Sequence, residues 1–582
     1  MIVSHRAILA VWGLFWVSVG HSAVLKPYNV TKDCYYLPQD QEWPSVSEWA
    51  QLNKSVDGRL IAGRPMAEVC RRSTFQSESC ADLKKEWILA NPHFQDPVSF
   101  YSPYWLNNTC SPFADADAPC DMGNLPSYAI NVSSAADVAA GLRFARTKNI
   151  RLTIKNTGHD FNGRSSGQGA LSLWMHNLND ISFFDYIGPT YLGRAVRMHS
   201  GVQAWDAYAA AGREGVRMVG GFCPTVGLVG GYVQGGGHGP LAPMYGMAAD
   251  NTLEFEVVTA DGRHLNVSAT QHPDLFWALN GGGGGNYAVV LSQVTKVFPD
   301  GIVGGATLTF NKSDTPAEQE PFWDSVTAWQ KHLLTLNSEP GFQAVYTVTN
   351  FSFQINFLTW PGKTKEQVNS SLAPFRAELD RRNINFTQVV SDDSGYHKHF
   401  ARYTPGLPFG KYVVFMILGG RLIPRRTLEN DAEGLTTAIR SITEDGRYTY
   451  NGISMNVSHA RAGNEPGANA VLPAWRDAAI SSNIVVEWHP EKGDTLDMLL
   501  ATQKEMNDVM VPQLEMVSPN SGTYMNEGTF DLATWKDDYY GTNYDKLLEI
   551  KKKWDPDMIF YGKPNVGNEY WKRMADGRLC RA

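Results

Sequence analysis

The chain has 582 residues, 43% of them hydrophobic, and 51 Lys and Arg against 59 Asp and Glu give a formal charge of −8. This balance offers no basic field for nucleic acid or for an anionic membrane surface, so neither is an expected partner. The length and apolar content suffice for one or two well-packed domains.

The chain begins with the pattern of a secretory signal peptide. Residues 1–6 form a short basic lead, residues 7–20 form an apolar run, and the small residues Ser22 and Ala23 follow. Such a run is too short to span a membrane. We therefore expect residues 1–23 to be a signal peptide, cleaved near Ala23. The mature protein is expected to be secreted, or to reside in the secretory-pathway or vacuolar lumen, with no membrane segment.

Cysteines and glycosylation sequons agree with that destination. Six of the seven cysteines can form three disulfides, and Cys223 is the natural odd one because it lies alone in a glycine-rich segment. The fifteen possible pairings stay open. The other cysteines are Cys34, Cys70, Cys80, Cys110, Cys120 and Cys580. The sequons are at Asn29, Asn53, Asn107, Asn131, Asn266, Asn311, Asn350, Asn369, Asn385 and Asn456.

In chain order, a cysteine-rich segment precedes alternating helices and strands. Residues 24–120 hold five cysteines with many Pro, Asn and Ser residues, which predicts an irregular, disulfide-tied cap. Ser133 and Ser134 can cap a helix that extends to about residue 145, and residues 150–154 alternate as a strand. Residues 253–257 and 265–267 predict a hairpin through Asp261-Gly262, and residues 274–279 a short helix.

Further along, apolar runs predict strands at 353–360, 412–418 and 484–488, with helices near 315–335 and 495–511. An amphipathic helix is expected at 544–554, where Asp555-Pro556 would end it. These patterns predict an α+β protein.

Three glycine-rich segments, at residues 155–167, 220–239 and 279–287, predict one large ligand site. Nine of the twenty residues in the middle segment are glycine, spaced among valines and aromatics. Such glycines let the backbone turn tightly or approach a ligand closely. Loops of this kind favour a phosphate-bearing cofactor, although any single segment could also be bulges in a buried sheet. The loops are not arranged as a GxGxxG strand-turn-helix, which disfavours a doubly wound dinucleotide fold.

The motifs resemble those of one flavoprotein family. Thr157-Gly-His-Asp with Gly163-Arg-Ser-Ser-Gly is similar to the loop whose histidine carries the flavin, and Gly221-Phe-Cys-Pro-Thr-Val-Gly to the loop whose cysteine binds it. Residues 540–556 resemble the family's C-terminal signature. On these motifs the chain resembles the vanillyl-alcohol oxidase superfamily of PCMH-type FAD proteins, in its berberine-bridge-enzyme-like branch, and specifically the secreted fungal members. The similarity covers residues 126–299 and 524–571.

The resemblance implies bicovalent FAD, bound through its 8α-methyl to His159 and through C6 to Cys223. It also implies a PCMH-type FAD-binding domain at 121–303 and a substrate domain with a large antiparallel sheet at 304–520. Residues 521–582 would then be a berberine-bridge-like segment that returns to the FAD domain. The residues expected to hold the cofactor, with Ser165 and Ser166 as extra donors to its pyrophosphate, are Thr157, Gly158, His159, Asp160, Gly163, Arg164, Ser165, Ser166, Cys223, Gly227, Gly230, Gly231, Gly237 and Gly239.

The catalytic residues are expected at 524–527, which resembles a family segment that faces the flavin. Glu527 stands where the branch often has Tyr. Burial beside an apolar ring would raise the pKa of this carboxyl group, so that it could act as base or acid. Strand alternation would point Tyr524 and Glu527 to opposite faces, so only one is expected to reach substrate. We favour Glu527, and a surface glutamate is the alternative.

Other candidates take smaller roles. Tyr287 is predicted to line the substrate pocket, and His238 to be a polar neighbour of the site rather than the base. His397 and His399 lack a third ligand at metal spacing, so they are assigned to a polar edge and no metal site is predicted.

These observations predict a monomeric, secreted oxidase. It would take hydride from an alcohol-like or secondary-metabolite substrate onto FAD, with O2 as the electron acceptor and H2O2 as the product. A redox-neutral isomerase or cyclase of a natural-product pathway, with Glu527 as general acid, is the second hypothesis, and a flavin-bearing binding protein is the third. The substrate stays open, because residues 304–520 carry the least resemblance.

Overall fold

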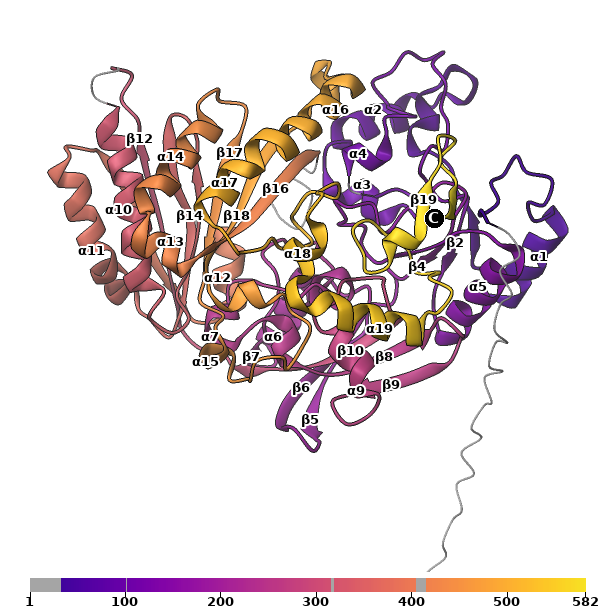
Figure 1. Ribbon diagram of the computed structural model, residues 1–582, viewed down its shortest axis with the longest axis horizontal. Coiled ribbons are helices and arrows are strands. Elements are labelled where there is room, and N and C mark those ends of the chain that lie inside the picture. Colours follow the sequence, from indigo (N-terminus) through magenta and orange to yellow (C-terminus); the bar gives the residue numbers. More distant parts are fainter. Residues whose placement is uncertain (1–32, 101, 316–318, 405–414) are drawn as a thin grey trace, which may run out of the picture.

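Three large β-sheets organise the chain, described here by a computed structural model over residues 33–100, 102–315, 319–404 and 415–582 (Figure 1). The predicted signal peptide and the Asn29 sequon lie outside these residues. Figure 1 shows the first and last parts of the chain together on one side and residues from about 300 to 500 on the other.

A four-stranded sheet and a five-stranded sheet form the part built from residues before 300. The first has the order β1-β2-β4-β3, with strands Leu60–Ala62, Tyr128–Asn131, Leu171–Trp174 and Leu152–Lys155. The second is antiparallel in the order β5-β6-β10-β8-β9, with strands Ile181–Ile187, Leu192–His199, Ala288–Lys296, Thr252–Thr259 and His264–Ser268. The predicted hairpin is confirmed as β8-β9, with Gly262 at φ +83° in its turn.

Local sequence signals place two helices beside these sheets. Helix α5 (Ala135–Lys148) starts after Ser134 as predicted, but the capping contact differs. The Asp137 carboxylate accepts hydrogen bonds from the backbone N–H and the hydroxyl of Ser133, both at 2.9 Å. Helix α9 (Pro273–Leu279) has Pro273 at its first position, where a missing N–H costs nothing, and confirms the predicted short helix.

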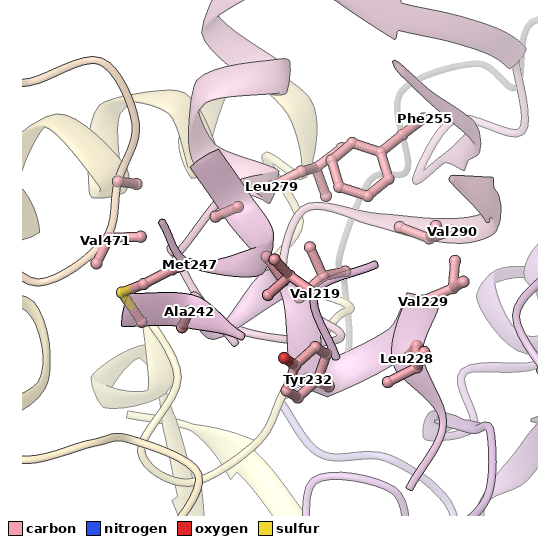
Figure 2. Packing of buried hydrophobic residues seen from close by; sticks show 14 of the residues in the cluster. Val219, Leu228, Val229, Tyr232, Ala242, Met247, Phe255, Leu279, Val290 and Val471 are labelled. Atoms are coloured by element: carbon pink, nitrogen blue, oxygen red, sulfur yellow. The ribbon is translucent and has the colours of Figure 1, made fainter. Parts of the chain in front are cut away.

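Apolar side chains of the glycine-rich segment 220–239 are part of a large hydrophobic core (Figure 2). These side chains pack against strands β8 and β10 and helix α9, so the segment is a rigid scaffold despite its glycines. The residues labelled in this core include Val219, Leu228, Val229, Tyr232, Phe255, Leu279 and Val290.

The segment before residue 120 is more regular than the predicted cap. It contains helices α1 (Val46–Ser55), α2 (Ser77–Glu86), α3 (Ala90–Gln95) and α4 (Pro103–Leu106), and its strand β1 pairs with β2 in the four-stranded sheet. A three-residue strand with a distant partner leaves no periodic pattern in the sequence, so β1 could not be predicted. Helix α1, in contrast, could have been predicted from the sequence, since Ser45 and Glu48 form a capping box at its start.

An antiparallel seven-stranded sheet forms the other half of the molecule, in the order β15-β12-β14-β13-β17-β18-β16. Helices α10 (Glu320–Leu336), α11 (Lys365–Arg381) and α14 (Ala432–Thr443) lie on its outer side (Figure 1). Trp329 and Phe375 pack there against Phe353 of the sheet. The strands are Phe386–Asp393, Val303–Asn311, Ser352–Pro361, Gln343–Val348, Thr449–Ser454, Ala478–Glu487 and Met416–Pro424. The predicted strand 353–360 lies within β14, and the predicted strand 484–488 overlaps β18. The predicted strand 412–418 overlaps β16, and its residues 412–414 lie outside the described ranges.

The last sixty residues return to the first half through helices α18 (Trp535–Tyr540) and α19 (Tyr544–Trp554) and strands β19 (Trp571–Arg573) and β20 (Leu579–Arg581). Lys551 of α19 is buried, and its ammonium group donates to the carbonyl of Asn286, at 2.5 Å, and to Asp555, at 2.7 Å. This contact ties α19 to the glycine segment 279–287. The disulfides are Cys34–Cys580, Cys70–Cys80 and Cys110–Cys120, and Cys223 is free, as predicted.

The surface carries several accessible sequons. Asn266, Asn311, Asn369 and Asn385 are exposed, whereas the half-buried Asn456 donates its side-chain amide to the Asn337 carbonyl at 3.1 Å. Within the described ranges, no helix combines the length and the apolar character that a bilayer span requires.

Candidate active site

Two adjoining cavities lie where the halves of the molecule meet. The narrower one, of about 90 Å³, is surrounded by the three glycine-rich segments, and the larger one, of about 580 Å³, extends to the seven-stranded sheet. Both are lined by His159, Arg164, Val226, Gly231 and Tyr232. The three segments singled out in the sequence therefore meet at one site.

Two glycines of the narrow cavity face open space. A Cβ built on Gly231 or on Gly285 meets no protein atom within 4 Å, so a side chain there would stand in the cavity. Gly284 is different, because its Cβ would lie 2.6 Å from the Cα of Gly231. The two loops are thus in backbone contact and leave a cradle open to an extended ligand.

The narrow cavity also offers polar groups. The side-chain oxygen of Gln234, a lining residue, is buried and has no hydrogen-bond partner in the described part of the chain, while its amide nitrogen donates to the Gly230 carbonyl at 3.2 Å. A buried acceptor without a partner is costly unless a ligand or water meets it. A cradle of backbone and an unmatched acceptor fit a nucleotide-type cofactor.

His159 and Cys223 come together at the boundary of the two cavities. The Cys223 Sγ lies 3.9 Å from His159 Nε2, and the Thr225 hydroxyl contacts both, at 3.4 Å and 2.8 Å. Burial lowers the pKa of His159 to about 3, so its imidazole is neutral, and burial raises the pKa of the Cys223 thiol. A neutral imidazole keeps a lone pair for bonding.

The loop after β3 uses its own polar groups internally. The Asp160 carboxylate accepts from the backbone N–H and the hydroxyl of Ser165, and the Ser166 hydroxyl donates to the Asn124 carbonyl. Both hydroxyls are therefore engaged within the protein, contrary to their predicted role as extra donors to a pyrophosphate. Arg164 donates to Asn526 at 2.8 Å, which links this loop to the C-terminal segment.

The structure divides the predicted cofactor residues into two groups. Gly163, Ser166, Gly237 and Gly239 do not line either cavity. Gly239 packs on the backbone of Gly220 and Gly163 on the Trp105 ring, where a Cβ would clash, so these glycines serve close packing of the loops. The residues that line the cavities are Thr157, Gly158, His159, Asp160, Arg164, Ser165, Cys223, Gly227, Gly230 and Gly231.

Tyr524 and Glu527 both line the larger cavity, contrary to the expected alternation. Residues 524–527 form a turn, in which the Glu527 N–H donates to the Tyr524 carbonyl at 3.0 Å, instead of a strand. Asn526 and Gly528 are typical turn residues, and this signal was available in the sequence. The turn brings the two side chains to the same side.

The carboxylate of Glu527 is held by two side chains. Its Oε1 lies 3.4 Å from His238 Nε2, and its Oε2 accepts from the Asn483 amide at 3.0 Å. Burial raises the pKa of Glu527, but the charge and hydrogen bond of His238 and the hydrogen bond of Asn483 outweigh it, so the pKa falls below its ordinary value. The predicted rise is wrong, because both partners come from distant segments. His238 is a polar neighbour, as expected.

Tyr524 stays a phenol at neutral pH. Burial, and next the charge of Glu527, raise the pKa of Tyr524 well above its ordinary value. Its hydroxyl accepts a hydrogen bond from the Asn526 amide at 2.8 Å, and its own proton has no acceptor among the described residues. The cavity therefore holds a proton acceptor, Glu527, and a hydrogen-bond donor, Tyr524, side by side.

Two further predictions are corrected. Tyr287 is fully buried and donates to the Gly282 carbonyl at 3.1 Å, so it supports the glycine loop and does not line the cavity. His399 lies on helix α12 (Tyr396–Tyr403), buried against Thr359 at 2.8 Å, and is no polar edge. In the described ranges no group of His, Cys, Asp and Glu could hold a metal ion.

Comparison with known proteins agrees with this geometry. The family model described as FAD binding domain matches residues 126–268, and the model described as Berberine and berberine like matches residues 523–567. The chain is 41% identical to the VAO-type flavoprotein oxidase VAO615 of Thermothelomyces thermophilus, over 95% of this chain and 96% of that protein. It is also 41% identical to the bifunctional decalin synthase calF of Penicillium decumbens, over 94% and 95%.

The crystal structure of the VAO-type flavoprotein MtVAO615 from Myceliophthora thermophila C1 superposes with a TM-score of 0.90 at 41% identity, covering 94% of this chain and all of that chain. The present protein is thus an FAD-dependent oxidoreductase with an FAD-binding fold and a large antiparallel sheet. It belongs to the vanillyl-alcohol-oxidase-type, PCMH-type FAD flavoproteins, in their berberine-bridge-enzyme-like branch.

Proposed function

We propose that this protein is a secreted oxidase that removes hydride from a carbon bearing a hydroxyl group, with FAD held by two covalent bonds and O2 as the final acceptor. The observation that carries the proposal is the single cavity lined by His159, Cys223, Tyr524 and Glu527. The predicted leader and the three disulfides support an extracellular or lumenal destination.

FAD bound in the narrow cavity would supply the hydride acceptor and pass electrons to O2, which becomes H2O2. The proximity of Cys223 Sγ and His159 Nε2, 3.9 Å, suits attachment of one ring through both side chains. Each attachment replaces a C–H bond by a C–N or C–S bond and releases two electrons and two protons, which O2 can accept. Thr225, in contact with both side chains, orients them.

The protein's own groups would divide the remaining chemistry. Glu527, a carboxylate at neutral pH because its pKa is lowered, would accept the proton of the substrate hydroxyl. Tyr524 would donate a hydrogen bond to the same oxygen and orient it. The carbon that bears the hydroxyl group would give up its hydride and become a carbonyl carbon. Asn483 and His238 would keep the carboxylate aimed at the cavity.

The first test is denaturation of the purified protein, followed by absorbance and peptide mass mapping. Flavin mass on the peptides of both His159 and Cys223 is expected, and flavin released on denaturation would refute the two-bond attachment. Anaerobic mixing with a panel of alcohols, sugars and phenols should then bleach the flavin, with one H2O2 per product once air is admitted. An enzyme with bound flavin that no member reduces would refute the oxidase.

A redox-neutral cyclase is the second candidate, favoured by the similarity to a protein named as a bifunctional decalin synthase. Glu527 suits the role of general acid poorly, because its pKa is lowered, whereas Tyr524 keeps its proton. A product of unchanged oxidation level, formed equally well without O2 and lost in Tyr524→Phe, would support this function over the oxidase.

A further inference from the structure

A row of polar side chains crosses the cavity face of the seven-stranded sheet. Thr347 of β13 pairs with Asn451 of β17, and Asn451 pairs with Asn483 of β18, so the three residues lie in one register across neighbouring strands. All three line the larger cavity. The alternate residues face the other way, where Tyr346 and Tyr450 are buried under the helices.

A β-bulge adds a fourth polar residue to this row. Between Ala306 and Leu308 of β12 there is one residue, but between their partners Leu358 and Ile355 of β14 there are two, Asn356 and Phe357. A bulge of this kind re-aims side chains and is frequent beside active sites. Asn356 and Phe357 consequently both line the cavity, although consecutive residues of a regular strand would face opposite sides.

The hydrogen bonds within the row leave capacity for a ligand. The Thr347 hydroxyl donates to Asn451 Oδ1 at 2.6 Å and accepts from Asn356 Nδ2 at 2.8 Å. Both functions of the hydroxyl are then used. The Asn451 amide nitrogen and the Asn356 amide oxygen have no partner among the described residues, and both side chains are only half-buried in a cavity wall. One offers a donor and the other an acceptor.

The row lies at a definite distance from the proposed reaction centre. Asn483 at its end holds Glu527. Because neighbouring strands are about 4.8 Å apart, Asn451 and Thr347 lie about 5 and 10 Å farther along the sheet. Aromatic rings occupy the same region, with Phe222 and Phe357 at 5.8 Å between centroids. A small alcohol at Glu527 would leave both the amides and the rings without contacts.

We propose that Asn356 and Asn451, positioned by the Thr347 hydroxyl between them, form a subsite that binds a second oxygen function of the substrate, remote from the carbon that is oxidised. The preferred substrate is then an elongated alcohol with a flat or unsaturated body and a hydroxyl or carbonyl group at its far end. This inference rests on the proposed function for the position of the reacting carbon, and it makes Asn451 and Thr347 specificity-determining residues.

The test compares two rigid probes, 4-biphenylmethanol and its 4′-hydroxy derivative, which differ by one hydroxyl at the far end. Their affinities for the anaerobic enzyme are measured by titration calorimetry after its flavin has been reduced, so that neither probe is oxidised during the titration. The hydroxylated probe should bind about fivefold more tightly to the wild type, the effect of one net hydrogen bond. Asn451→Leu and Thr347→Val should each bring that ratio close to one.

Ile453→Leu provides the matched control, because Ile453 lines the same cavity on the same strand but carries no polar group. It should change both affinities equally and leave the ratio intact. A wild-type ratio near one, a ratio that survives in Asn451→Leu and Thr347→Val, or no binding of the hydroxylated probe overturns the subsite. Probes that bind with the expected ratio but never bleach the flavin overturn the proposed oxidation and leave the subsite standing.

Discussion

Replacement of His238 by Leu should move the acid limb of the rate profile to higher pH. The imidazole of His238 contacts Glu527 Oε1 at 3.4 Å and is a main reason why the pKa of this carboxyl group is lowered. A proton acceptor works only as the carboxylate, so the rate of flavin reduction should fall as pH drops through the pKa of Glu527. Without His238, burial prevails and the pKa rises.

The size of the shift follows from the contact. A hydrogen bond to a charged group contributes about 1.5–3 kcal/mol, and a separation of 3.4 Å places this one at the weak end. At about 1.4 kcal/mol per pKa unit, the acid limb should move up by roughly one unit. Leu fits the site, since His238 is buried among the rings of Phe222, Trp475 and Tyr524.

The assay is stopped-flow reduction of the flavin under anaerobic conditions between pH 3 and 8, with the fastest alcohol of the panel. His238→Gln is the control, because it keeps a neutral donor and should give a smaller shift. Covalent flavin content and thermal midpoint must match the wild type in both variants. An acid limb that stays in place in His238→Leu, or that moves to lower pH, refutes the assignment of Glu527 as the base.

Three further outcomes are expected. Thr225→Val should slow covalent attachment of the flavin about fivefold, because one hydrogen bond to His159 is lost, whereas Thr225→Ser should keep the wild-type rate. The readout is the flavin retained after denaturation, and unchanged retention in Thr225→Val would contradict the orienting role of Thr225. Gly284→Ala should lower the flavin content and reduce the free energy of unfolding by about 1–3 kcal/mol, since the new Cβ meets the Gly231 backbone. Gly301→Ala is the control: its Cβ would face open space, so its thermal unfolding should match the wild type. Joint replacement of Cys34 and Cys580 by Ala should cost about 2–5 kcal/mol in denaturant unfolding, and an unchanged midpoint would show that the bridge is dispensable.

Structural features that depend on a few neighbouring residues could be predicted from the sequence. The β8-β9 hairpin, helix α9 and the amphipathic helix α19 depend on turn residues and on the period of apolar side chains, which act over a few positions. The odd cysteine followed from its isolation in a glycine-rich segment. The His159 and Cys223 loops stood out by motif, and the cavity confirms that they lie together. Thr225, Gly284 and Gly285 lie within the glycine-rich segments, but no sequence pattern distinguished them from their neighbours.

The tertiary structure decided what depends on distant partners. The pKa of Glu527 is set by His238, 289 residues away, and by Asn483, in the region with least resemblance, so its direction could not be found from local sequence. Tyr287 lies under the glycine loop, where its hydroxyl donates to the Gly282 carbonyl. The bulge at Asn356 exists only in the register of β12 with β14. Sequence patterns thus determined the elements and the cofactor loops, whereas side-chain electrostatics and the shape of the substrate cavity arise from contacts between remote segments.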